Sequence, residues 1–100
     1  MKIPKKIKVG GHIYDVDTNY FFKERFDRCG SSDHQQKEIK ITKIDTGGRP
    51  RHISDVEVTF IHELLHCVDE VYNANSLEEK SVSVLAEGLY QVLKDNKLLK

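Results

Sequence analysis

Two histidines and a glutamate occur in the segment His62-Glu63-Leu64-Leu65-His66 at a spacing that suits metal-dependent hydrolysis. Residues four apart in an α-helix lie almost one above the other, so His62 and His66 can direct both imidazole rings at one point. Such a pair is typical of a Zn²⁺ site. Glu63 is offset from His62 by about 100° around the helix axis. We therefore expect Glu63 beside the metal as a general base rather than as a ligand.

The motif is rare by chance and lies in a segment patterned as a helix. With 5 His and 8 Glu in 100 residues, random placement yields about 0.02 matches. Ser54 followed by Glu57 predicts a capping box that starts the helix, and the polar residues 73–76 end it. Its predicted buried stripe consists of apolar residues at helical spacing, namely Ile61, Leu64, Leu65, Val68 and Tyr72.

A catalytic zinc site usually takes three protein ligands and keeps a fourth position for water. No histidine follows His66, and Asp69 and Tyr72 stand where the longer metzincin motif requires Gly and His. The third ligand must then be an acid on another element. Glu78 and Glu79 open the next predicted helix, and either carboxylate could reach the metal. Spacing alone does not choose between them, and acids at a helix N-terminus are also favoured simply by the helix dipole.

This next helix is predicted over residues 77–96. Glu87 lies away from its apolar face, so we expect it in solvent. On the preceding helix, Asp69 shares the face of the two histidines, where it could hydrogen-bond an imidazole or remain a plain surface acid. The predicted apolar face of the second helix consists of Val82, Leu85, Ala86, Leu89, Val92 and Leu93.

The residues at the start of the chain have β-strand patterning. Residues 7–9 and 13–17 flank Gly10 and Gly11, a pair that can adopt the positive φ angles of a tight turn. This arrangement predicts a β-hairpin. The segment 20–28 has aromatic residues one helical turn apart, and we interpret it as a short helix.

A second strand pair is predicted directly before the zinc helix. Residues 38–44 alternate between apolar and polar side chains, which indicates a strand with one buried face. Residues 29–33 could pair with this strand across the polar turn 34–37. Residues 45–51 contain two glycines and a proline and are predicted to form a loop.

Length and composition indicate a single domain over residues 1–100 with a thin core. The 16 basic and 16 acidic residues cancel, so nothing points to a nucleic-acid or membrane partner. Because no apolar run suits an export signal or a membrane span, we expect a cytoplasmic protein with Cys29 and Cys67 as reduced thiols. His12, His34 and His52 fall in predicted turns or loops and are expected in solvent.

The zinc-helix motif and the segment after it resemble the small gluzincin-type metallopeptidases, in particular short phage- and prophage-encoded proteins of the ImmA/IrrE-like group. The resemblance covers about residues 30–96 and is sharpest in 60–66 and 78–96. It implies that His62 and His66 bind zinc and that Glu63 is the general base. It places the third ligand at the acid that opens the following helix.

Within this resemblance, the family pattern puts the third ligand at Glu79, with Glu78 as the fallback. The chain departs from the family in size, with no separate substrate-binding domain, and its sequence does not single out one residue as the family's transition-state-stabilising Tyr or His. Tyr72 and Tyr90 are candidates for that role, and Tyr90 is equally suited to packing.

The resulting prediction is an α+β domain of minimal zincin-like form, in which a small, mostly antiparallel β-sheet packs on the zinc helix and a C-terminal helix closes the site. The predicted function is that of a zinc-dependent metallopeptidase, which hydrolyses a peptide or protein substrate with a metal-activated water and Glu63 as general base. The alternative is a non-catalytic protein-interaction module of phage origin, in which the same site binds zinc structurally.

Overall fold

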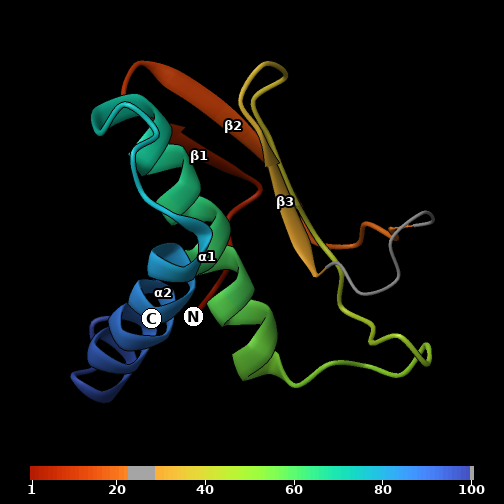
Figure 1. The fold of residues 1–100 in the computed structure, drawn as a ribbon. Coiled ribbons are helices and arrows are strands. Elements are labelled where there is room, and N and C mark those ends of the chain that lie inside the picture. The colour runs from red at the N-terminus through yellow and green to blue at the C-terminus, as the bar shows by residue number, and fades with distance from the viewer. Residues whose placement is uncertain (23–28, 100) are drawn as a thin grey trace.

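The described residues form a four-stranded mixed sheet followed by two helices (Figure 1). The structure is a computed structural model that describes residues 1–22 and 29–99. Its architecture is α+β, as predicted. The elements in chain order are β1 (Lys6–Val9), β2 (His12–Asp17), β3 (Gly30–Asp33), β4 (Glu38–Ile41), α1 (Ile53–Tyr72) and α2 (Glu79–Asp95).

The strand order is β1-β2-β4-β3, with antiparallel pairs at both edges and a parallel pair, β2 with β4, in the middle. The predicted N-terminal hairpin is confirmed. Gly10 turns it with a φ of 63°, and a Cβ at this position would lie 2.7 Å from Cγ1 of Val71. Glycine is therefore required at this turn both by the backbone angle and by the close approach of α1.

The predicted strand pair before α1 is also confirmed, with shorter strands than expected. β4 ends at Ile41 rather than at residue 44, and β3 begins one residue later than predicted, at Gly30. Alternation along β4 buries Ile39 and Ile41 completely, and the same pattern on β2 buries Tyr14 and Val16. The prediction of a helix at 20–28 is wrong for residues 20–22, which have no regular structure, and its remainder, 23–28, lies outside the described residues.

The start of α1 differs from the predicted capping box. The helix begins at Ile53 with His52 as N-cap, and no side chain caps it. The Glu57 side chain is buried instead, and its carboxylate accepts a hydrogen bond of 2.5 Å from the Tyr90 hydroxyl of α2. A tertiary partner has therefore replaced the local one that Ser54 offered.

Helix α1 lies between the sheet and α2 (Figure 1). Because it is covered on two sides, its buried apolar residues do not form the single predicted stripe. Ile61 is buried as predicted, whereas Val68 is 38% exposed and Tyr72 is 70% exposed. The other buried apolar residues of α1 are Val56, Phe60 and Cys67.

Among the described elements, α2 packs against α1 alone. It therefore buries only a narrow stripe of residues. The prediction that Leu85, Leu89 and Val92 belong to its buried face is wrong, because each of them is at least 40% exposed. The buried residues of α2 are Val82, Ala86 and Tyr90. In the described part of the chain, no helix combines the length and the hydropathy needed to span a membrane.

Candidate metal centre

The two motif histidines face one another on the exposed side of α1. Their Nε2 atoms lie 3.2 Å apart, and the ring centroids are separated by 4.9 Å. Each side chain is 20% exposed. The spacing of four residues therefore produces the convergence of His62 and His66 that the helix geometry predicts.

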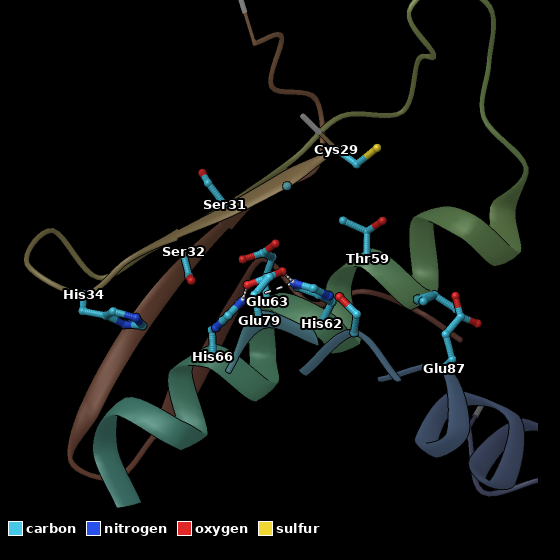
Figure 2. A pocket seen from close by; sticks show the side chains of 13 residues that line it. Cys29, Ser31, Ser32, His34, Thr59, His62, Glu63, His66, Glu79 and Glu87 are labelled. Atoms are coloured by element: carbon cyan, nitrogen blue, oxygen red, sulfur yellow. Dashed lines mark hydrogen bonds and ion pairs between the residues drawn. The ribbon is translucent and has the colours of Figure 1, made fainter. Parts of the chain in front are cut away.

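The first residue of α2 completes the group. One carboxylate oxygen of Glu79 lies 2.7 Å from Nε2 of His62, and the other lies 2.9 Å from Nε2 of His66 (Figure 2). Glu78 precedes it as the N-cap of α2 and is exposed. Of the two acids that the sequence left open, the structure thus brings Glu79 to the histidines.

The donor atoms of this group fit a divalent cation. Those of His62, His66 and Glu79 all lie within 4.8 Å of one another. Ligands placed tetrahedrally at about 2.0–2.2 Å from zinc lie roughly 3.3–3.6 Å apart. The three separations in the structure are shorter than this, at 2.7, 2.9 and 3.2 Å, and the first two have the length of ion pairs, so the side chains would move apart slightly on binding an ion. Two imidazoles and one carboxylate are also a donor set found in catalytic zinc sites.

Glu63 lies beside the three donors without belonging to them. Its side chain is directed to the sheet side of α1, and the residue is 6% exposed. Burial raises the pKa of its carboxyl group, and the positive potential of His62 and His66 together with a hydrogen bond from Ser32 only partly opposes this effect. A buried carboxyl group whose pKa is raised has an increased affinity for a proton, which suits a general base.

The start of β3 approaches Glu63 so closely that it requires a glycine. A Cβ on Gly30 would lie 2.7 Å from Cγ2 of Thr59 and 3.0 Å from a carboxylate oxygen of Glu63. Neither Gly30 nor Ser32 belongs to the site predicted from the sequence. A glycine at the start of a strand is nevertheless a recognised signal of close backbone approach.

A cleft of about 800 Å³ opens above these residues. Figure 2 shows the three metal-donor residues and Glu63 on one side and the β3 segment on the other. His34 and Glu87, which were both expected in solvent, line this cleft; His34 is half-buried, whereas Glu87 is exposed. The remaining lining residues are Cys29, Gly30, Ser31, Ser32, Val58, Thr59 and Ser83.

Three other candidates, Asp69, Tyr72 and Tyr90, do not line the cleft. Asp69 is 2% exposed and is not a surface acid. Its carboxylate accepts hydrogen bonds from the Asn73 side chain and the backbone N–H of Leu77, so it orders the connection between the helices. Tyr72 and Tyr90 are not among the described residues that line the cleft. Tyr90 is buried against Glu57, which makes it a structural residue.

The two cysteines do not form a disulfide: Cys67 is fully buried in α1, and Cys29 is exposed beside the cleft.

Comparisons with protein-family models, with curated proteins and with solved structures find no match to this chain.

Proposed function

We propose that this protein is a zinc-dependent peptidase whose metal is held by His62, His66 and Glu79. The observation that carries the proposal is the position of Glu63. This carboxylate is buried, lies next to the three convergent donors, and lines the same open cleft. A site that bound metal only for stability would not need a second carboxylate of raised proton affinity at its side.

Each residue has a distinct part in the proposed reaction. A bound zinc ion supplies a Lewis acid that polarises the substrate carbonyl and makes water a better nucleophile at neutral pH. Glu63 removes a proton from the attacking water and later delivers it to the nitrogen of the leaving amine. Ser32 donates a hydrogen bond to the Glu63 carboxylate and thereby orients it.

The cleft suits an extended peptide because β3 lies at the edge of the sheet. Its neighbour on one side is β4, and Gly30, Ser31 and Ser32 of β3 line the cleft. A peptide that binds alongside β3 would add a strand to the sheet through main-chain hydrogen bonds. Such binding recognises any extended chain, so peptides or flexible protein segments are the expected substrates.

The test begins with the metal content of protein purified without added zinc, together with thermal unfolding before and after chelation. We expect about one zinc per chain and a lower melting temperature after chelation, because the ion binds only the folded state. Zinc-loaded protein should then cleave members of a quenched fluorescent peptide library, and Glu63→Gln should abolish cleavage while it retains zinc.

Two results would contradict this proposal. The metal site is refuted if His62→Ala and the wild type show the same zinc content and the same response to chelation. Peptidase activity is refuted if fully loaded wild type cleaves no library peptide, or if Glu63→Gln cleaves as fast as the wild type.

The second candidate is a binding module in which zinc is purely structural. One observation favours it: α2 packs only on α1 among the described elements, and Glu79 links the start of α2 to the histidines of α1. A metal would then fix α2 in place. This candidate predicts loss of stability on chelation without any turnover that Glu63→Gln could remove.

A cytoplasmic location belongs to the same proposal. A fully buried thiol at Cys67 suits a reducing compartment. The resemblance to small phage-encoded peptidases of the ImmA/IrrE-like group stays a prediction.

A further inference from the structure

Glu87 is a carboxylate at the cleft that has no part in the metal centre or in the proposed proton transfer. It lies on α2, eight residues after Glu79, and both residues line the cleft together with Ser83 between them. Positions four apart share one face of a helix, so these three side chains follow one another along the cleft. Figure 2 shows His34 at one end of the cleft and Glu87 at the other, with the metal-donor residues between them.

The charge of Glu87 is not compensated by any residue that the structure describes. No hydrogen bond or ion pair joins its carboxylate to one of them. The residues three and four positions away on the helix, where an ion pair could form, carry no positive charge. They are Ser83, Val84, Tyr90 and Gln91. Arg51 reaches the Thr59 hydroxyl in the wall of the cleft, but its guanidinium group donates to that hydroxyl and to two backbone carbonyl groups.

The described lining of the cleft contains three glutamates and no lysine or arginine. Glu79 and Glu63 have roles at the metal centre, whereas Glu87 is too far from it for a bound ion to offset its charge. The rise of an α-helix separates the backbones of Glu79 and Glu87 by about 12 Å. At physiological ionic strength, exposed charges are screened over about 8 Å. The end of the cleft at Glu87 is therefore negative whether or not a metal is bound.

The pairing of β3 with β4 indicates where a peptide would lie relative to Glu87. The backbone N–H of Thr42 donates to the carbonyl oxygen of Cys29. Because hydrogen-bonded pairs alternate along an antiparallel ladder, Gly30 and Ser32 direct their main-chain groups away from β4. The Gly30 backbone lies close to the Glu63 side chain, and Ser32 is hydrogen-bonded to it. A peptide that pairs with these two residues would have its main chain beside the general base.

The distance to Glu87 sets which residue of such a peptide it meets. An extended chain advances about 3.3 Å per residue, so about 12 Å corresponds to roughly three to four residues. The side chains on both sides cover part of this distance, which brings the second to fourth residue from the cleaved bond into reach. Lysine and arginine carry a positive charge on a long, flexible stem and complement an exposed carboxylate.

We propose that Glu87 makes the cleft selective for peptides with a lysine or arginine about two to four residues from the cleaved bond. The inference rests on the proposed peptidase function, because it concerns the substrate of the same cleft. Glu87 is exposed, and exposed ion pairs are weak, so the selectivity is moderate. We expect about fivefold between a peptide with Lys and the same peptide with Glu at that position.

The test uses one peptide from the quenched fluorescent library, with its cleavage site located by mass spectrometry. A series of variants carries a single Lys or a single Glu at the second, third or fourth residue on either side of the cleaved bond. Zinc-loaded wild type should show a kcat/KM about fivefold higher for Lys than for Glu at one or more of these positions. The ratio should approach one between about 0.05 and 0.5 M salt, because exposed charges are screened.

Charge reversal at Glu87 identifies the source of the selectivity. At matched zinc content, Glu87→Lys should prefer the Glu peptide at the same position, an inversion that a purely structural effect would not produce. The matched control is Asp95→Lys, which makes the same change of charge at an exposed residue of α2 outside the described lining of the cleft. This control should keep the preference of the wild type for Lys.

Equal kcat/KM for the Lys and Glu peptides at every position in the wild type, or an unchanged preference in Glu87→Lys, overturns the inference. If the loaded wild type cleaves no library peptide, the proposed function fails, and binding then decides the inference. The probes are dye-labelled, otherwise uncharged octapeptides with one Lys or one Glu, measured by fluorescence anisotropy. Tighter binding of the Lys peptides that is inverted in Glu87→Lys supports selectivity at Glu87, and any other result overturns it.

Discussion

Two buried glutamates lie less than two turns apart on α1, and their surroundings shift the pKa values of their carboxyl groups in opposite directions. Glu57 is 4% exposed and Glu63 is 6% exposed. At Glu57, burial by itself would raise the pKa, but hydrogen bonds from Tyr90 and from the amino group of Met1 outweigh it and lower the pKa. At Glu63, burial prevails over the nearby histidines and the pKa is raised.

This difference in pKa and in partners distinguishes Glu57, a structural carboxylate, from Glu63, a carboxylate available for chemistry. Glu57 receives a hydrogen bond of 2.5 Å from Tyr90 and lies 3.2 Å from the amino nitrogen of Met1, so its charge is well compensated. Glu63 lies among groups that would themselves bind a metal and substrate. Burial alone therefore does not identify a functional acid on this helix, and the partners of each carboxylate decide its role.

The largest expected effect is on catalysis and concerns Glu63 alone. Glu63→Gln should lower kcat by about 10²- to 10⁴-fold, because general base catalysis typically contributes this much. Glu57→Gln should leave the kcat of the folded fraction within about twofold of the wild type, since Glu57 does not line the cleft. Both variants are assayed with one library peptide at matched zinc content. Similar losses of kcat in the two variants would remove the contrast between the two sites.

A smaller effect on kcat, together with a loss of stability, is expected when Gly30, whose backbone lies close to the Glu63 side chain, is replaced. Gly30→Ala introduces a Cβ 2.7 Å from Thr59 and 3.0 Å from Glu63, which should cost about 1–3 kcal/mol of unfolding free energy. Because the clash displaces the Glu63 carboxylate, kcat should fall as well. The matched control is Gly11→Ala, since a Cβ there meets nothing within 4 Å. Urea unfolding and peptide cleavage measure the two consequences, and a Gly30→Ala protein with normal kcat would show that Glu63 tolerates displacement.

The sequence predicted those parts of the site that depend on spacing within one helix. The convergence of His62 and His66 follows from a separation of four residues. The choice of Glu79 over Glu78 depends instead on where α2 begins, which its packing on α1 determines. The position of His34 at the cleft escaped prediction because its ring contacts Tyr14, which lies 20 residues away in sequence.

The same limit explains the errors in the fold. Within residues 1–22 and 29–99, local patterns predicted the four strands and the two helices, since alternation and helical periodicity are properties of neighbouring residues. At Glu57 the local pattern predicts the wrong hydrogen-bond partner. Next to Ser54 it has the pattern of a capping box, yet its observed partner is Tyr90 on the other helix. A single sequence contains no information on which of two good hydrogen-bond partners the folded chain brings into reach.

The variant Tyr90→Phe tests the structural role of Glu57. This change removes the hydroxyl donor from the buried Glu57 carboxylate, which retains its contact with the amino group of Met1. We expect a loss of about 1–2 kcal/mol in unfolding free energy, the usual effect of removing one partner of a buried charged acceptor. Zinc content and kcat should not change. Undiminished stability in urea unfolding would mean that the Tyr90 hydroxyl contributes nothing to the compensation of Glu57.

The smallest effect is a pH dependence of stability that originates at Glu57. Its pKa in the folded protein is below the ordinary value of 4.5, so the folded state binds fewer protons there than the unfolded state. The stabilisation is therefore complete above about pH 4.5 and is lost as the pH falls through the lower, folded pKa. Since the other carboxyl groups titrate in both proteins, the difference in unfolding free energy between wild type and Glu57→Gln isolates this contribution. That difference should shrink as the pH falls below about 4.5, and a constant difference would show that Glu57 has no lowered pKa and that its contrast with Glu63 rests on position alone.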